Sequence, residues 1–358
     1  MLSFFYFGER GRRMSDLQNL ENAIFQAGFD AFAIMPVTSL NNMLPILEKA
    51  MDEDRYPAFV DRDIQKRINP LKFQKSAKSI ISLAISYNTG HAGPTPSLHG
   101  TISRSAWGED YHNVLNRRMD KIINYLKTDF GAKECSKAVD TSFLIDRALA
   151  IEAGMGFPGS NCAVYVPPFG SWVFLSEILV DVKLPTTKKP DQCNWSEPVK
   201  CTACVKACPT GALVSPGTID AKRCLSYLTQ KSGSIPMEFR DKLGYRLWGC
   251  DTCQQACGIN QKAPLTKHKE FEPIVGPHFP LLTLLEMDKN EFNKVFSATS
   301  IAWRGKNILQ RNACIVLGNH KDPEALPILE ETTRNHPSDM VREAARWGMD
   351  KIQRYGKS

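Results

Sequence analysis

The sequence predicts an α+β protein built from a mixed α/β region, a cysteine-rich region and an α-helical C-terminal region. Three observations support this prediction. Strand-like and helix-like segments before residue 185 do not alternate strictly. Eight of the 11 cysteines fall between Cys193 and Cys257, and short helical patterns follow one another from about residue 280. We therefore expect three domains, at residues 1–185, 186–265 and 266–358.

In the first region, apolar periodicity predicts one helix that ends near Gly28 and another over 110–127. The β-branched run 80–85 is typical of a buried strand, and two further strands are expected at 163–166 and 172–180. Because parallel α/β folds alternate strands and helices strictly, the looser order here favours α+β.

Composition and charge exclude several classes of protein. With 42% hydrophobic and 23% charged residues, the chain has a globular composition and is not wholly disordered. No apolar stretch approaches the ~18 residues that a membrane span needs, so no membrane partner is expected. The net charge of +7 is a mild basic excess, which is compatible with a nucleic-acid partner.

The N-terminus predicts a cytoplasmic protein. The apolar segment 1–7 is short and basic residues follow it, whereas a secretory signal carries its charge before the apolar run. Either Met1 or Met14 is the start, because Ser15 to Gln18 has the pattern of a helix capping box. In the reducing cytoplasm, clustered cysteines are expected to be metal ligands or catalytic groups.

Two cysteine runs in the middle region have the spacing of iron–sulfur ligands. They comprise Cys201, Cys204 and Cys208, followed by proline, and Cys250, Cys253 and Cys257, with Cys224 between them. The spacing C-x2-C-x3-C-P is half of a ferredoxin run, in which the last cysteine ligates the other cluster. A zinc site, the alternative, typically uses two C-x2-C pairs and gives the third cysteine of each run no role. The spacing therefore predicts two 4Fe–4S clusters.

Two such clusters need eight thiolates. A full ferredoxin run would place one of them three residues before Cys201, but that position is Pro198. We predict that Cys193, the nearest spare cysteine, is the missing ligand; the alternative is a cluster that has an open corner or loses iron. The other three cysteines are expected to be buried thiols: Cys135, Cys162 and Cys314.

The C-terminal region repeats short apolar helix faces separated by polar connectors, which resembles stacked HEAT-type repeats. The polar, proline-punctuated segment 185–192 is expected to be the linker before the cysteine region. Arg304, Lys306 and Arg311 are candidates for contacts with a phosphate backbone, and the alternative is a solvated helix face.

Two carboxylates in the first region are candidates for acid–base chemistry. Asp140 follows an apolar pair, so it either ends a strand or caps a helix that begins near Phe143, and the residues alone favour the cap. Asp146 directly precedes Arg147 and is expected to form a surface ion pair with it.

Beyond the cysteines, much of the chain resembles the epoxyqueuosine reductases, cobalamin-dependent iron–sulfur enzymes that complete queuosine on tRNA. The resemblance covers essentially residues 15–355. The segments that carry it are Ser105–His112, Val139–Thr141, Asp146–Ala148, Ala153–Phe157, Gly170–Leu179, Arg223–Thr229, Trp248–Gln254, Arg311–Ala313 and Leu317–Asn319. The chain departs from the family pattern at Pro198, in the insertion before Cys201, at Gly258, and at Pro158 and Ser160.

The resemblance implies which residues hold the cofactors. One cluster would use Cys201, Cys204, Cys257 and Cys193, and the other would use Cys208, Cys224, Cys250 and Cys253. Cobalamin would lie between the first two domains and contact Asp140, Val164, Ser226, Cys250 and Asp251. Cobalamin rests on the resemblance alone: the segment from Asp110 to Leu115 lacks the glycine of a cobalamin-ligating Asp-x-His-x-x-Gly motif and is predicted to be a helix N-terminus.

The resemblance also implies the activity. Epoxyqueuosine in tRNA would be reduced to queuosine, with electrons passing through the clusters to cobalamin and Asp140 protonating the leaving oxygen. Arg304, Lys306 and Arg311 would bind the tRNA. An unidentified low-potential donor would supply the electrons, and a monomer is expected. The alternatives are a reductive dehalogenase-like cobalamin enzyme, whose typical twin-arginine signal is not found here, and a non-catalytic ferredoxin-type electron carrier.

Overall fold

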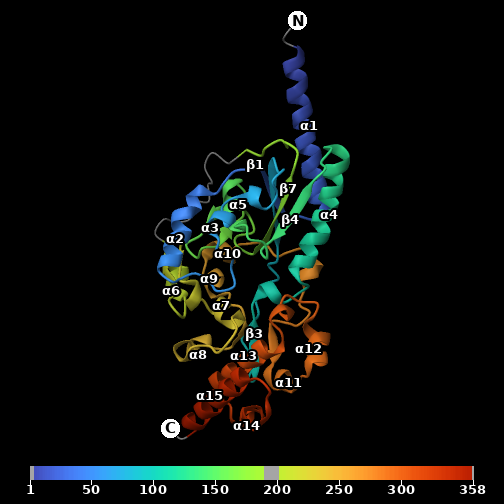
Figure 1. Ribbon diagram of the computed structural model, residues 1–358. Coiled ribbons are helices and arrows are strands. Elements are labelled where there is room, and N and C mark those ends of the chain that lie inside the picture. Colours follow the sequence, from blue (N-terminus) through green and yellow to red (C-terminus); the bar gives the residue numbers. More distant parts are fainter. Residues whose placement is uncertain (1–3, 189–200, 357–358) are drawn as a thin grey trace.

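The structure, a computed structural model, describes residues 4–188 and 201–356 and has a mixed α/β fold (Figure 1). The first helix, α1 (Phe4–Ala27), projects from one end of the molecule, and the C-terminal helices lie at the other end. Helix α1 ends just before Gly28, whose positive φ of 102° ends the helix as predicted. Because α1 runs through Ser15 without a break, the predicted capping box there is wrong. The predicted ligand Cys193 lies outside the described residues.

The first region is organised around a four-stranded antiparallel sheet. Its order is β1 (Ala31–Pro36), β2 (Ser79–Ser86), β7 (Val173–Val180), β4 (Cys135–Val139). The predicted strands at 80–85 and 172–180 are thus confirmed. The strand expected at 163–166 is shorter and belongs to a separate ribbon, in which β6 (Val164–Tyr165) pairs with β5 (Phe157–Pro158).

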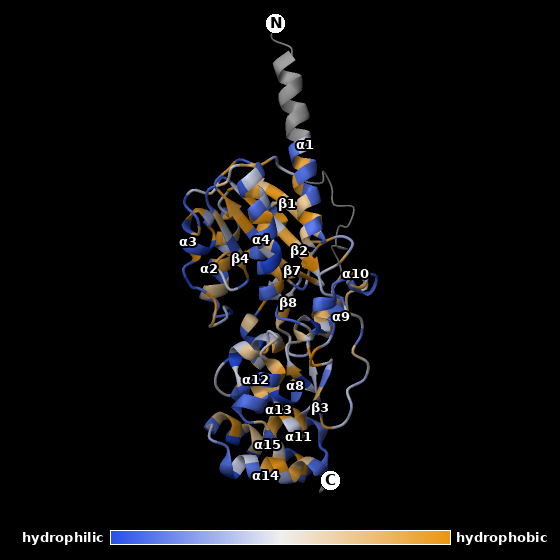
Figure 2. Ribbon diagram, turned by 90° about the vertical axis from the view of Figure 1, so that its right-hand side faces the viewer, coloured by the Kyte–Doolittle hydropathy of each residue, from blue (hydrophilic) through white to orange (hydrophobic). Residues whose placement is uncertain are grey.

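Helices cover both faces of this sheet. Helices α1 and α4 (Tyr111–Asp129) pack on one face, where Ile81, Leu83 and Ile85 are buried against them. The other face, which includes Ile80 and Ala84, is covered by α2 (Leu44–Asp52), α3 (Ile64–Arg67) and α5 (Asp146–Glu152). Burial on both faces explains why β2 has apolar residues on both sides of the sheet, with Ser82 as the polar residue between its ends, and Figure 2 shows the strands as predominantly hydrophobic.

The cysteine region consists of short elements that begin or end at cysteines. Cys208 follows α6 (Ala203–Ala207), Cys224 precedes α7 (Leu225–Gln230), and Cys257 precedes α10 (Gly258–Gln261). The remaining elements are α8 (Met237–Leu243), α9 (Thr252–Gln255), and the ribbon of β8 (Leu213–Ser215) and β9 (Thr218–Ile219). Single-turn 3-10 helices cover Asn41–Met43, Pro70–Lys72, Arg104–Ala106, Ala221–Arg223, Lys269–Phe271, Ala302–Arg304 and Pro323–Ala325.

A second sheet joins segments from all three predicted regions. Strand β3 (His99–Ile102) pairs in parallel with β10 (Arg246–Trp248) and antiparallel with β11 (His278–Pro280). One apolar core continues from this sheet into the C-terminal helices. The sheet and the core thus connect the three predicted regions, and the domain boundaries at 185 and 265 stay predictions from the sequence.

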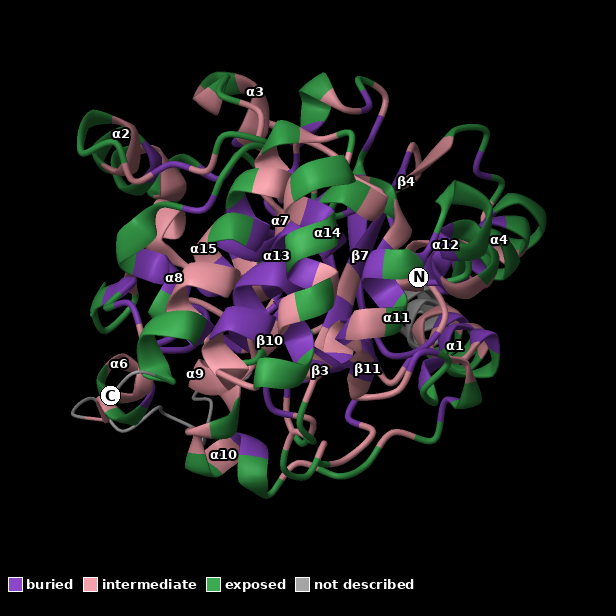
Figure 3. Cartoon of the chain, turned by 90° about the horizontal axis from the view of Figure 1, so that it is seen from below, coloured by how far each residue is buried: buried purple, intermediate pink, exposed green. Residues whose placement is uncertain are grey.

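The C-terminal helices pack around one central helix. Helix α13 (Lys306–His320) is buried almost along its whole length, and Figure 3 shows it in the middle of the end view. Its neighbours are α11 (Leu281–Glu286), α12 (Lys289–Phe296), α14 (Leu326–Asn335) and α15 (Asp339–Tyr355). A Cβ at Gly318 would lie 2.7 Å from the Cα of Gly348, so both glycines are needed for the close crossing of α13 and α15.

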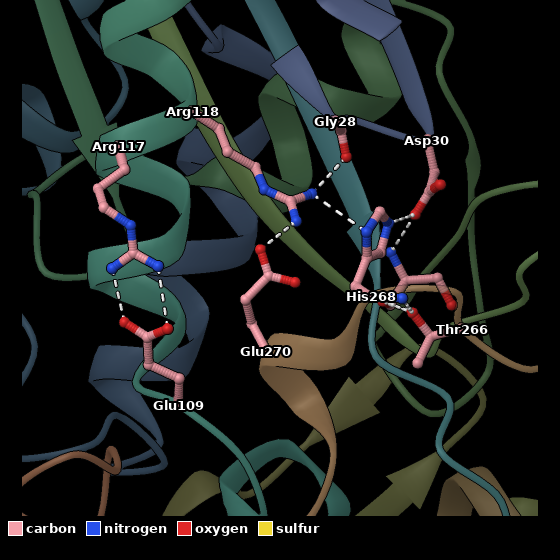
Figure 4. Close-up of polar contacts among 9 residues, drawn as sticks. Gly28, Asp30, Glu109, Arg117, Arg118, Thr266, His268 and Glu270 are labelled. Carbon is pink, nitrogen blue, oxygen red and sulfur yellow. Dashed lines mark hydrogen bonds and ion pairs between the residues drawn. The ribbon is translucent and has the colours of Figure 1, made fainter. Parts of the chain in front are cut away.

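Polar contacts hold the segment 266–270, which leads to the C-terminal region, against α4 and against Asp30, just before β1 (Figure 4). Asp30 accepts from His268 Nε2 at 2.7 Å, with both side chains almost fully buried, and Arg118 on α4 pairs with Glu270 at 2.6 Å. Burial raises the pKa of Asp30, but its hydrogen bonds to His268 and Ser86 outweigh this and lower it. These contacts fix the orientation of α4, whose first turn carries the polar side chains described next.

Among the described residues, no helix combines the length and the apolar character that crossing a membrane requires.

Candidate functional site: a carboxylate cavity and two cysteine groups

Asp140 is held by two side chains from the first turn of α4. It lies directly after β4, and its exposed carboxylate accepts from the Tyr111 hydroxyl at one oxygen and from His112 Nε2, at 2.6 Å, at the other. The helix after Asp140 begins only at Asp146, and its N-cap residue Ile145 makes no side-chain cap. The cap predicted for Asp140 from the residues alone is therefore wrong. Neither Tyr111 nor His112 was predicted as a partner of Asp140, because they lie 29 and 28 positions earlier in the chain.

His112 bridges two carboxylates. Asp110 caps α4 as predicted, because its Oδ1 accepts from the backbone N–H of His112 at 3.1 Å, and it also binds His112 Nδ1 at 2.6 Å. Burial lowers the pKa of His112, but the hydrogen bonds and charges of Asp110 and Asp140 outweigh it and raise the pKa to about 9. At neutral pH the ring is an imidazolium that donates to both carboxylates.

Asp140 and Asp146 line one cavity of about 290 Å³ next to Tyr111 and Phe174. The Tyr111 ring stacks on Phe174 with centroids 4.1 Å apart, so the hydroxyl is aimed at Asp140 by a rigid aromatic pair. Burial and the nearby Asp140 raise the pKa of the Tyr111 hydroxyl well above its ordinary value, so Tyr111 is a neutral donor. The cavity thus presents a carboxylate with two hydrogen-bond donors behind it.

The surface ion pair predicted between Asp146 and Arg147 is wrong. Arg147 donates to the carbonyl of Cys162, whereas the Asp146 carboxyl turns inward toward Glu177 on β7. One oxygen of each of these carboxyl groups is buried without a hydrogen-bond donor among the described residues.

The structure brings the cysteines predicted for the second cluster together. Cys224 lies close enough to Cys208 and Cys250 for their charges to interact, and Cys253 interacts in the same way with Cys250 and Cys224. Cys204 and Cys257, both predicted for the first cluster, lie near Tyr165. Helices α6 and α9, which carry parts of the two runs, pack against each other.

Backbone N–H groups point at two of these sulfurs. Burial raises the pKa of the Cys208 thiol, but the N–H groups of Leu213, Thr210 and Ala212 outweigh it and hold the pKa below its ordinary value. At Cys224 burial prevails and raises the pKa to about 11, although the N–H groups of Tyr227 and Ser226 oppose it. Such amides suit cluster-bound thiolates, because hydrogen bonds to the sulfurs stabilise and tune a cluster.

The described cysteines form no disulfide bonds, and no three His, Cys, Asp or Glu side chains in the described ranges converge closely enough for a single metal ion. A cluster holds its thiolates at separate corners and does not require such convergence. Of the three isolated cysteines predicted to be buried, Cys314 is buried, but Cys135 and Cys162 are only half-buried.

The five residues predicted to contact cobalamin do not line one cavity. Cys250 and Asp251 line a cavity of about 240 Å³ that is different from the one beside Asp140. Asp251 accepts from the Ser103 hydroxyl and, at 2.8 Å, from the backbone N–H of Arg104. Val164 is buried in β6, and Ser226 lies in α7. Asp140 thus borders one of these cavities, and Cys250 and Asp251 border the other.

The basic tail residues differ in location. Arg311 is fully buried and donates to the carbonyls of Leu228, Thr229, Lys231 and Gly233 and to the side chain of Asn312. Its predicted contact with tRNA is wrong, because its donors are satisfied inside the protein. Lys306 is half-buried and donates to the carbonyl of Met287 at 3.2 Å. Arg304 lies over the ring of the exposed Trp303, 3.7 Å from its centroid.

The two cysteine runs identify the class of protein to which the chain belongs. The family model of a 4Fe-4S double cluster binding domain matches residues 197–260, which contain both cysteine runs, so the chain is an iron–sulfur redox protein. A second model, described as epoxyqueuosine reductase QueG, DUF1730, matches residues 67–141 and so includes α4 and Asp140.

Curated relatives agree with the second model. The chain is 40% identical over 300 residues to the epoxyqueuosine reductase of Bacillus subtilis (strain 168), which covers 82% of this chain and 76% of the relative. It is 33% identical over 342 residues to the epoxyqueuosine reductase of Staphylococcus aureus (strain NCTC 8325 / PS 47), covering 94% and 88%. The chain belongs to the epoxyqueuosine reductase family.

Solved structures share the fold. A crystal structure of epoxyqueuosine reductase with an epoxyqueuosine-modified tRNA-Tyr stem loop superposes with a TM-score of 0.88 at 36% identity, covering 94% of this chain and 89% of that one. A structure of the Bacillus subtilis enzyme, described with its catalytic aspartate loop swung out of the active site, gives a TM-score of 0.85 at 35% identity, covering 94% and 90%.

Proposed function

We propose that this chain reduces epoxyqueuosine in tRNA to queuosine. Removing the epoxide oxygen takes two electrons and two protons, breaks both C–O bonds and releases water. The observation that carries the proposal is the carboxylate of Asp140, which lines a cavity with two donor side chains behind it in a member of this family. A relative solved with its catalytic aspartate loop swung out supports the choice of an aspartate on a loop.

Asp140 is the general acid in this proposal. As a protonated acid it would donate to the departing oxygen, and the resulting carboxylate would accept hydrogen bonds from Tyr111 and His112. The charge of the His112 imidazolium stabilises that carboxylate. Because Tyr111 and His112 share one helix turn, they orient Asp140 toward the cavity at little entropic cost.

Two 4Fe–4S clusters would supply single electrons from an unidentified low-potential donor. Cys208, Cys224, Cys250 and Cys253 would hold one cluster, and Cys201, Cys204, Cys257 and Cys193 the other. The charge interactions among the first set and the amides around Cys208 support this set, and an interaction of Cys253 with Cys204 indicates that the two sets adjoin.

Cobalamin is the finer part of the proposal and follows from the family alone. When bound, it would supply a strongly nucleophilic cobalt for the epoxide carbon. The residues of this chain that would contact it are Asp140, Val164, Ser226, Cys250 and Asp251. A spectral titration of the cluster-loaded protein with cobalamin tests the binding directly, and unchanged cobalamin bands at saturating protein would contradict it.

We propose that tRNA reaches the surface formed by Trp303, Arg304 and Phe59. Arg304 stacks on Trp303 and lies 5.0 Å from the ring centroid of Phe59, and both rings are about half exposed. Exposed aromatic rings beside a guanidinium suit unpaired bases, since every base offers a face for stacking. Lys306, two residues further on, adds a charge for the phosphates. Trp303 and Arg304 lie in the short segment between α12 and α13, and the helices α11–α15 would be the HEAT-like repeats of a cytoplasmic monomer.

The decisive assay incubates the cluster-loaded protein with an epoxyqueuosine-modified stem loop, a chemical reductant and cobalamin, and follows the loss of one oxygen from the nucleoside by mass spectrometry. Asp140→Asn, which retains the hydrogen-bond acceptor but has no acidic proton, is the matched control. Complete retention of the oxygen by a wild-type protein that carries its full iron load would overturn the proposed function.

A further inference from the structure

Glu177 is a carboxyl group in the centre of the main sheet. It lies on β7, where its register partners are Ser82 on β2 and Ala138 on β4, and it is fully buried. One oxygen accepts from the Ser82 hydroxyl at 3.4 Å, and the other has no donor among the described residues. A buried carboxylate without donors is costly, so this group needs a proton or a partner that carries one.

That partner is Asp146, in the first turn of α5. Its carboxyl lies within hydrogen-bonding reach of Glu177, and its Oδ1 is likewise buried without a donor. Two ionised carboxylates are acceptors only, so they cannot bond to each other. A single proton between them supplies the missing donor to both and removes one of two like charges from the interior.

The surrounding charges do not remove the need for this proton. The charge of Arg147 lowers the pKa of Asp146, but the Arg147 guanidinium donates its hydrogen bond to the Cys162 carbonyl. Arg67, also at the cavity, donates to the Phe143 carbonyl and to the hydroxyl of Tyr56. Burial and the charge of Asp140 raise the pKa of Asp146 to about 7, and burial and Asp146 raise the pKa of Glu177 well above its ordinary value.

Asp146 and Asp140 line the same cavity, so the shared proton borders the reacting site. We propose that Asp146 and Glu177 hold one proton between them and return it to Asp140 after each protonation of the substrate. This role rests on the proposed function. In the step, an O–H bond breaks on the pair and forms on the Asp140 carboxylate, and a proton from water then restores the pair. No electrons move.

His112 is the rival source of this proton. It touches Asp140, but its imidazolium holds its proton with a pKa of about 9. A group that titrates near neutral pH gives up a proton to a carboxylate more readily, because proton transfer is most efficient when the donor pKa lies near the working pH. In this arrangement His112 positions Asp140, and the pair of Asp146 and Glu177 resupplies it.

The first test needs no turnover. Infrared difference spectra of the cluster-loaded protein, titrated from pH 5 to 9, report the C=O stretch of a protonated carboxyl group. We expect a buried carboxyl band that persists into the neutral range in wild type and is lost in Glu177→Gln. Glu177→Gln keeps the size and a hydrogen bond to Asp146 but removes one carboxyl. Absence of the band in wild type at neutral pH would overturn the shared proton.

The second test uses the pH profile of reduction. Glu177→Gln and Asp146→Asn should each lower turnover by about 10- to 100-fold, the scale of acid–base assistance. Each should also remove the decline in wild-type rate that we expect as pH rises through about 7. Asp120→Asn, which removes an exposed carboxylate of α4 paired with Lys137, is the control and should keep the wild-type profile.

The outcomes separate the two proposals. A wild-type pH profile in both variants overturns the resupply of Asp140, whatever the infrared result. An inactive wild-type protein overturns the proposed function and the resupply with it, while the carboxyl band still decides whether the pair shares a proton. If either variant does not fold, the infrared titration of wild type and the remaining variant decide.

Discussion

Replacing His112 by Gln should remove most of the pH-dependent stabilisation that the imidazolium of His112 gives to the folded protein. The imidazolium of His112 is held between Asp110 and Asp140, which raise its pKa from 6.5 to about 9. A pKa that is higher in the folded state stabilises the protein fully below the unfolded value and loses this stabilisation as pH rises through the folded value. The loss therefore falls between about pH 6.5 and 9.

The magnitude follows from that shift. Raising the pKa from 6.5 to about 9 corresponds to about 3 kcal/mol of unfolding free energy. The side chain of His112 is only 26% exposed, so solvent screens its contacts weakly. Wild type should thus lose about 3 kcal/mol more than His112→Gln between pH 6 and pH 9.5.

The assay is anaerobic denaturant unfolding of the cluster-loaded protein at pH 6, 7.5 and 9.5, for wild type, His112→Gln and His91→Gln. His91 is exposed, so its replacement should leave the pH dependence of wild type unchanged. Only the difference between variants is interpreted, because clusters complicate the absolute values. Parallel pH dependences for wild type and His112→Gln would refute the bridging of Asp110 and Asp140 by an imidazolium.

The remaining predictions concern the reaction, the clusters and the tRNA. Asp140→Asn should lower turnover by ~100-fold or more with unchanged iron content, because an amide has no acidic proton; a wild-type rate would exclude Asp140 as the acid. Cys193→Ser should lose one of two clusters, about four irons per chain; a full iron load would show that Cys193 is no ligand. Replacing Arg304 and Lys306 together should make the slope of log affinity for tRNA against log salt less steep. Each lost phosphate contact should reduce the slope by roughly 0.7 to 0.9. Replacing Trp303 by Ala should weaken tRNA binding by ~1–3 kcal/mol with no change in that slope. If neither the double replacement nor Trp303→Ala changes the affinity, the tRNA binds at another surface.

Local patterns predicted the helices and the cysteine groups well. The face of α4 follows from apolar residues at helical spacing, and Val114, Leu115, Met119, Ile122, Ile123 and Leu126 are all buried. The cysteine spacing is also a local signal, because the closely spaced cysteines of one run ligate the same pair of clusters. Strand β1 was missed although Ala31–Pro36 is a short apolar run, and β4 gives almost no signal because three of its five residues are only half-buried.

Contacts between distant segments could not be read in the same way. The pairing of β3 with β10 and β11 joins residues near 100 with residues near 247 and 279, and nothing in the local pattern of His99–Ile102 specifies such partners. Arg311 has the residue type of a phosphate contact, yet it is the fixed donor that joins α13 to the end of α7. Residue type predicts what a side chain can do, and burial decides what it does.

The same argument applies to the acid–base site, where sequence neighbours are misleading. Arg147 adjoins Asp146 in the sequence, but on a helix adjacent residues point about 100° apart and do not face each other. Asp146 instead meets Glu177, a residue of the sheet 31 positions later, and Asp140 meets Tyr111 and His112, 29 and 28 positions earlier. Asp140 and Asp146 line one cavity, and His112 and Glu177 contact them from behind its wall. Asp140 is held by a cation, whereas Asp146 and Glu177 have only each other, and burial raises the pKa of both, so this pair can store a proton beside the group that releases one.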